Sequence, residues 1–233
     1  YVNYIVQLSV GIIKEQSVMI NLYVFKRNYC LCSVNSSIPK SQVSTLEKNL
    51  AFIKSPLLVM QQYNIIPAIK NASTNVAIAQ EQFPSSNAAL ITMTTYLQLT
   101  SNLLTRMASI ADFSSNATSL KMTSCDQLQK RISILYFEFW FFTQVQYAAA
   151  VNYTTFVSYT AVISASYAAS NLTLTQAQRQ SAVNLITSLT ILMNFYQHYI
   201  VDLSFSIWKL ATVIVDVQFL GDTYCWCEDK NSN

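Results

Sequence analysis

The sequence predicts a mainly α protein: a bundle of four or five long helices, with a small β hairpin or sheet that joins the N- and C-terminal segments. Only two of the 233 residues are glycine and only four are proline. Tight turns and hairpins depend on glycine because it adopts positive φ without steric strain. A chain with so little glycine has few turns and long elements, and we interpret residues 1–233 as a single domain.

The N-terminal segment, residues 1–34, alternates between apolar and polar side chains. The even-numbered positions of residues 2–12 are all apolar or aromatic: Val2, Tyr4, Val6, Leu8, Val10 and Ile12. The alternation resumes over residues 18–24, after a polar interruption at 14–16. A period of two is typical of a strand with one buried face, so two strands in a hairpin are predicted. An apolar helix is the alternative for either segment.

Helical periodicity begins near residue 41. The pattern Ser44-x-x-Glu47 matches a capping box, in which the two side chains bond the free backbone N–H groups of a helix start. Pro67 predicts a kink or break, because proline removes a backbone donor from a helix interior. Apolar residues at helical spacing then predict a helix over residues 86–112.

Two longer helices complete the helical part, which is predicted to span residues 41–220. A polar loop over residues 114–119 precedes the first of them, predicted over 124–169. The second is predicted over 173–218, before Gly221 ends the helical part.

Three charged residues recur every seven positions in the last predicted helix: Asp202, Lys209 and Asp216. This spacing places them in one stripe along an otherwise apolar rod. The stripe is interpreted either as a solvent face or as a contact that sets the register against another helix. Both interpretations are kept, because only 11% of the chain is charged.

The five cysteines indicate whether the protein belongs to an oxidising or a reducing compartment. Four of them form two Cys-x-Cys pairs near the chain ends, namely Cys30, Cys32, Cys225 and Cys227. The second pair lies on a predicted strand over residues 222–230, and in a strand residues i and i+2 share a face. Two bridges between the ends are therefore predicted, with the connectivity left open. A four-cysteine zinc site is the alternative, although its usual spacer is longer. Cys125 is left over, as a buried thiol or an intermolecular disulfide.

Five Asn-x-Ser/Thr patterns predict N-glycosylation sites at Asn35, Asn71, Asn116, Asn152 and Asn171. Asn35, Asn116 and Asn171 lie in polar stretches where loops are expected. Together with the predicted disulfides, these sites favour a secreted protein of the oxidising extracellular compartment.

The apolar composition raises the question of a membrane. Between Glu138 and Asp202 the only charged residue is Arg179. The best candidate span, residues 132–151, is interrupted by Glu138 and by polar residues such as Gln144, so a constitutive span is not favoured. Nucleic acid is not an expected partner, because no cluster of Lys and Arg with interleaved aromatics is present.

Few residues suggest chemistry. The single histidine, His198, lies one helical turn from Asp202, so it is either half of an acid–base dyad or an ordinary histidine on a packed helix. Glu138 is either a buried acid with a raised pKa, or faces outward or pairs with a neighbour such as Arg131. No phosphate-binding glycine loop or nucleophile elbow is present. No catalytic set, cofactor or metal is predicted.

These observations predict a secreted, N-glycosylated, disulfide-bonded helical protein that acts as a non-enzymatic structural or interaction subunit of an extracellular assembly. Self-association, as a homo-oligomer or filament, is the expected partnership. One alternative is a carrier that holds lipid or another apolar ligand between its helices. The other is a membrane-active helical protein of the pore-forming type, which would insert residues 132–170.

Overall fold

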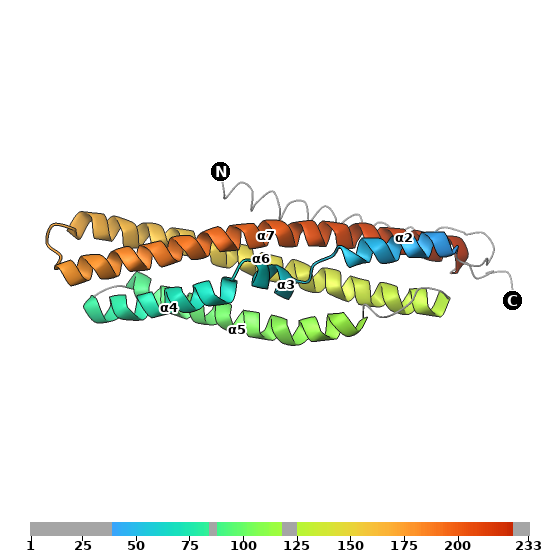
Figure 1. Ribbon diagram of the computed structural model, residues 1–233, viewed down its shortest axis with the longest axis horizontal. Coiled ribbons are helices and arrows are strands. Elements are labelled where there is room, and N and C mark those ends of the chain that lie inside the picture. The colour runs from blue at the N-terminus through green and yellow to red at the C-terminus, as the bar shows by residue number, and fades with distance from the viewer. Residues whose placement is uncertain (1–38, 84–87, 118–124, 226–233) are drawn as a thin grey trace.

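The computed structural model describes residues 39–83, 88–117 and 125–225, and these form an elongated helical bundle (Figure 1). Its helices are α2 (Lys40–Ala51), α3 (Pro56–Gln62), α4 (Ile65–Gln82), α5 (Ala88–Ala117), α6 (Cys125–Ser170) and α7 (Gln176–Tyr224). The predicted mainly helical bundle is confirmed. The predicted β hairpin is not supported, since the described residues contain no strand; its residues 1–34 lie outside them.

Helices α6 and α7 form a long hairpin in which both helices bury residues spaced alternately four and three apart. On α6 these residues are Leu128, Ile132, Leu135, Phe139, Phe142, Gln146, Ala149, Tyr153, Phe156, Thr160 and Ile163. On α7 they are Leu185, Leu189, Leu192, Tyr196, Tyr199, Leu203, Ser206, Leu210, Val213, Val217 and Leu220. This repeat of 3.5 residues is the pattern of a coiled coil, which keeps one seam facing its partner over the whole length.

Polar side chains fix the antiparallel register of this hairpin. The Gln146 side-chain amide donates to the Ser204 hydroxyl at 2.7 Å. Farther along, the Gln218 side-chain amide donates to the Tyr136 hydroxyl. A buried amide is tolerated in a seam only where it is hydrogen-bonded, so a shifted register would leave these groups unsatisfied.

The chain from α2 to α4 runs antiparallel along α7 (Figure 1). At the far end of α4, the Gln82 carbonyl accepts a hydrogen bond from the Gln178 side chain at 3.2 Å. Before α3, the ring of Phe52 lies 5.1 Å from the Lys209 ammonium. As the chain advances from Phe52 to Gln82, its contacts on α7 therefore move backwards from Lys209 to Gln178.

Helix α5 completes the bundle by packing on both α4 and α6. The Gln80 side-chain amide of α4 donates to the Thr94 hydroxyl of α5 at 3.2 Å. On the other side, the ring centroids of Tyr96 and Tyr159 lie 6.2 Å apart. Helices α4 to α7 thus surround the core toward the end of the rod that holds the α6–α7 turn.

The predicted capping box is wrong, whereas the break predicted near Pro67 is present three residues earlier. Helix α2 begins at Lys40, so Ser44 and Glu47 lie inside it and form no capping box. Pro67 neither kinks nor breaks the chain, because it lies in the first turn of α4, where its missing N–H would have had no partner. The break comes at Asn64, which has φ 50° and ψ 37°, a left-handed conformation that asparagine tolerates.

The boundaries of the later helices also differ from prediction. Helix α5 continues to Ala117, so residues 114–117 of the predicted loop are helical. Helix α7 begins at Gln176 rather than 173, behind a capping box formed by Thr175 and Gln178. The Thr175 hydroxyl accepts from the Gln178 N–H at 3.3 Å, and the Gln178 side chain accepts from the Thr175 N–H at 3.0 Å.

The predicted strand over residues 222–230 is wrong at its start, because α7 continues through Gly221 to Tyr224. A glycine inside a helix costs only about 1 kcal/mol relative to alanine. Burial of Val217 and Leu220 along the seam offsets that cost. Residues 226–230 lie outside the described residues.

Two charged side chains are buried on one face of α6. Arg131 is 1% exposed and Glu138 is 7% exposed, two helical turns away. Burial lowers the pKa of Arg131, and the charge of Glu138 opposes this shift. The interpretation of Glu138 as a partner of Arg131 is therefore favoured over an outward-facing carboxyl.

We expect Arg131→Met to lower the free energy of unfolding by about 3 kcal/mol, because it leaves the buried Glu138 without this compensating charge. The double variant Arg131→Met/Glu138→Gln should recover at least about 1 kcal/mol of that loss. Urea unfolding followed by circular dichroism measures both values. A double variant that is no more stable than the single one would contradict the pairing.

Candidate functional site

The charged stripe of α7 contacts the segment that contains α2 and α3. The Asp202 carboxylate accepts a hydrogen bond from the Tyr63 hydroxyl at 2.6 Å. The Lys209 ammonium lies over the ring of Phe52, and also 4.6 Å from the ring centroid of Phe205 on its own helix. Of the two interpretations of the stripe, a contact that sets the register between helices is therefore favoured over a solvent face.

The environment of Asp202 bears on the proposed dyad with His198. The rings of His198 and Tyr63 are stacked, with centroids 5.6 Å apart, and His198 is exposed. The hydrogen bond to Asp202, followed by burial and the charge of Asp202, raises the pKa of Tyr63 to about 12. Asp202 is therefore engaged by Tyr63, and no hydrogen bond among the described residues joins it to His198.

Asp216, the third member of the stripe, lines a groove of about 360 Å³ between α2 and α7. The α2 side of this groove includes Thr45 and Leu46, and the α7 side includes Phe219. Burial raises the pKa of the Asp216 carboxyl above its ordinary value. The stripe thus ends in a partly apolar groove where a charge is unfavourable.

The raised pKa of Asp216 predicts how stability depends on pH. The neutral carboxyl favours the folded state, a contribution that is fully present below the ordinary pKa of 3.8 and is lost as the pH rises through the folded pKa. Asp216→Asn should therefore be more stable than the natural chain at pH 7, by about 0.5 kcal/mol after solvent screening. Urea unfolding at pH 7 and pH 3 should show this difference only at pH 7, and a less stable variant at pH 7 would contradict it.

Exposed apolar side chains form a row on each of the two long helices. We call these the aromatic rows: Phe137, Trp140, Tyr147 and Val151 on α6, and Val201, Phe205 and Trp208 on α7. Trp140 is 57% exposed and Phe205 is 56% exposed. The hydrogen bond from Gln146 to Ser204 shows that the two rows lie at the same position along the bundle axis.

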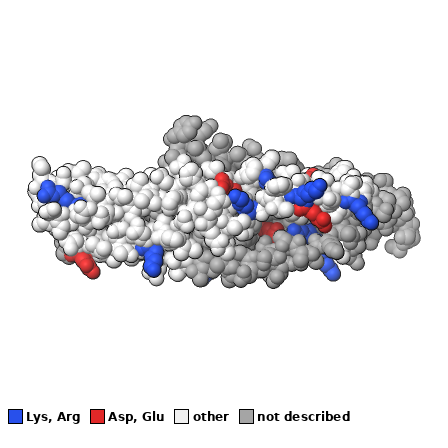
Figure 2. All heavy atoms as spheres, in the orientation of Figure 1, with Lys and Arg blue, Asp and Glu red and all other residues white. Residues whose placement is uncertain are grey.

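Charge is unevenly distributed over the surface. Charged side chains gather on the half of the visible face toward α2, and few lie on the other half (Figure 2). On α6 no charged residue follows Glu138. Large exposed apolar groups are typical of a surface that binds another macromolecule. The charge that lies against the rows is the Lys209 ammonium, over the ring of Phe205.

The sequence did not separate the exposed from the buried aromatic residues of the run over 136–142. In the structure Phe139 and Phe142 belong to the seam, whereas Phe137 and Trp140 are exposed. The alternating spacing of four and three residues is the signal that separates the two groups, since Phe137 and Trp140 fall outside it.

The cysteines are placed only in part. Cys225 follows the end of α7, where its N–H donates to the Gly221 carbonyl at 2.9 Å. No two cysteines in the described part of the chain lie at disulfide distance. Cys30, Cys32 and Cys227 lie outside that part, and Cys125 begins α6. The predicted bridges between the two Cys-x-Cys pairs therefore stay predictions.

The predicted glycosylation sites lie in different settings. Asn171 is in the α6–α7 turn, as expected, whereas Asn116 lies within α5 rather than in a loop. Asn71 is exposed on α4, and Asn152 is half-buried on α6. Asn35 lies outside the described residues. The attachment of sugar at any of these positions stays a prediction.

The described residues hold neither a membrane span nor a metal site. Among the described helices, none is long and apolar enough to cross a membrane. Over residues 39–83, 88–117 and 125–225, no group of three or more His, Cys, Asp and Glu side chains is arranged to hold a metal ion. Comparisons with known proteins found no matching family model, no matching curated protein and no matching solved structure.

Proposed function

We propose that the protein is a secreted, N-glycosylated, disulfide-bonded and non-enzymatic subunit of an extracellular assembly, and that it self-associates through the aromatic rows of α6 and α7. The observation that carries this proposal is the exposure of Trp140, Tyr147, Phe205 and Trp208 along one length of the hairpin. The sequons and the cysteines support the extracellular compartment.

The composition of the rows suits contact between proteins. Interface cores are enriched in aromatic residues and depleted in charge, and a few aromatic residues often supply most of the binding energy. Phe205 and Trp208 are stacked with ring centroids 5.8 Å apart, so they present one continuous apolar surface. A second rod packed alongside either row would bury its aromatic side chains.

The alternatives have less support. The cavity at one end of the bundle has a volume of about 270 Å³, which is below the range of about 300–1,000 Å³ that is typical for drug-sized ligands. The seam between α6 and α7 is filled by side chains, which leaves little room for a lipid chain. Insertion of residues 132–170 gains no support, because no described helix is suited to span a membrane.

Sedimentation velocity tests the proposal with the intact, disulfide-bonded protein. The natural chain should associate at micromolar concentration, and Trp140→Lys/Phe205→Lys should weaken that association at least tenfold, because the interface would have to desolvate two charges. The matched control is Ile91→Lys, which charges a side chain on α5 that is 64% exposed and lies outside the rows. The control should associate like the natural chain.

A natural chain that stays monomeric up to about 100 μM would overturn the proposed self-association. Equal weakening of association by Trp140→Lys/Phe205→Lys and by the control Ile91→Lys would also overturn it. Intact-mass measurement tests the proposed N-glycans and disulfides. The mass of the native protein is compared before and after glycan removal, and before and after reduction. A bare chain without disulfides would contradict the extracellular compartment.

A further inference from the structure

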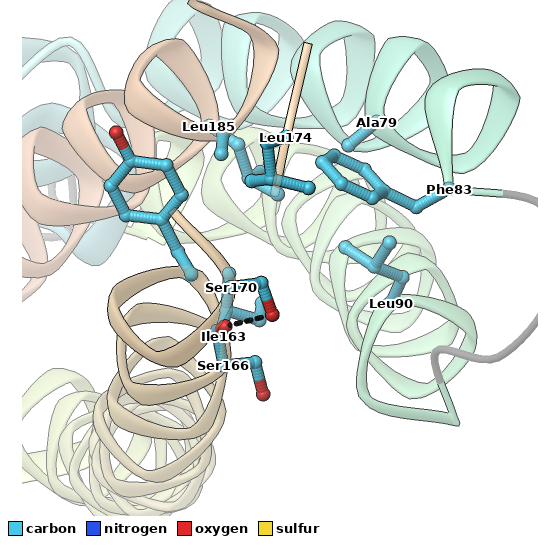
Figure 3. Close-up of a pocket in the computed structure, with 10 residues that line it drawn as sticks. Ala79, Phe83, Leu90, Ile163, Ser166, Ser170, Leu174 and Leu185 are labelled. Carbon is cyan, nitrogen blue, oxygen red and sulfur yellow. Dashed lines mark hydrogen bonds between the residues drawn. The ribbon is translucent and has the colours of Figure 1, made fainter. Parts of the chain in front are cut away.

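A cavity of about 270 Å³ lies where the ends of four helices meet at the α6–α7 turn (Figure 3). Its apolar walls include Phe83 after α4, Leu90 at the start of α5, Leu174 in the turn and Leu185 on α7. Leu90 and Leu185 belong to the buried core, so the cavity continues the apolar interior of the bundle.

The remaining side of the cavity is polar and comes from the last turns of α6. Ser166, Tyr167 and Ser170 line it there. Figure 3 shows Ser170 on one side of the cavity, with Phe83 and Leu90 on the other. The Ser170 hydroxyl donates its hydrogen to the Ser166 carbonyl at 2.9 Å, which leaves its oxygen lone pairs to accept a bond.

The cavity selects against charge. None of its described lining residues is Asp, Glu, Lys or Arg. Transfer of an ionised group into such a site without a counter-charge is strongly unfavourable. The cavity therefore favours a neutral ligand over a charged one.

The size of the cavity limits the ligand further. A molecule of water takes about 30 Å³ in the liquid, so the cavity has room for a ligand with roughly ten non-hydrogen atoms. The small side chains of Ala79 and Ala182, which face the cavity from α4 and α7, leave this space open. A longer side chain at either position would fill part of it.

We propose that this cavity binds a small uncharged amphiphile, such as a medium-chain alcohol, with its hydroxyl toward Ser170 and its chain between Phe83 and Leu90. The hydroxyl donates a hydrogen bond to the Ser170 oxygen, and the chain replaces water along the apolar walls. The site lies at the end of the rod and is separate from the aromatic rows, so its test is independent of self-association.

Isothermal titration calorimetry of the full disulfide-bonded chain with 1-octanol and with octanoate at pH 7 tests the proposal. The two probes share the length of their carbon chain and differ in charge. Octanol should bind one site per chain saturably, and octanoate should bind at least tenfold more weakly. Absence of saturable octanol binding, or equal binding of both probes, would overturn the proposal.

Variants of the turn locate the site. Leu174→Trp should abolish octanol binding by filling the cavity, whereas the matched control Leu172→Trp should bind octanol unchanged, because Leu172 is 96% exposed and does not line the cavity. Ser170→Ala adds no bulk and should weaken octanol binding severalfold through the lost acceptor, which keeps the test valid even if Leu174→Trp does not fold. Octanol binding that survives unchanged in Ser170→Ala and in a folded Leu174→Trp would refute the site.

Discussion

The repeat of 3.5 residues that α6 and α7 share is the constraint on which the rest of the structure depends. Each helix keeps its buried residues at alternating spacings of four and three, from Leu128 to Ile163 and from Leu185 to Leu220. A straight α-helix has 3.6 residues per turn, so such a seam faces its partner only when the two helices supercoil. The seam supports helices of 46 and 49 residues, about 69 and 74 Å long at 1.5 Å per residue, and it gives the shorter helices one long surface on which to pack.

The register of the seam also sets what lies beside it. Asp202, Lys209 and Asp216 each stand one residue before a seam residue, so they follow one stripe along the edge of the core. That edge meets the interrupted chain around α3, where Tyr63 and Phe52 supply a hydroxyl and a ring to the charges. Toward α4 the same position of the repeat holds Ser181 and Ser188, which are buried. Phe195 holds the same position between Ser188 and Asp202. The charged members of the stripe therefore begin where its neighbour changes from the continuous helix α4 to the interrupted chain around α3.

Much of the helical part was predictable from the sequence, because scarce glycine and apolar periodicity act locally. The limits of α6 agree with the prediction to within one residue at each end. The errors arose where tertiary contacts decided the outcome. Gly221 was expected to end α7, but burial beside Leu220 keeps it helical. The break expected near Pro67 lies three residues earlier, at Asn64, which places Pro67 in a first turn. The cavity was not predictable, because its walls come from four helix ends that only the fold brings together.

The antiparallel course of α2 to α4 along α7 is the central claim of this account, and an amine-reactive cross-linker tests it on the natural chain. Lys54 lies two residues after Phe52, whose ring contacts Lys209, whereas Lys70 lies on α4, about 24 Å farther along the bundle than Lys54 at 1.5 Å per residue. Mass spectrometry should find Lys54 joined to Lys209 within one chain, as a mixture of isotopically light and heavy protein can establish. Joining of Lys70 to Lys209 within one chain, without the link to Lys54, would contradict the register and with it the contact between the charged stripe and α3.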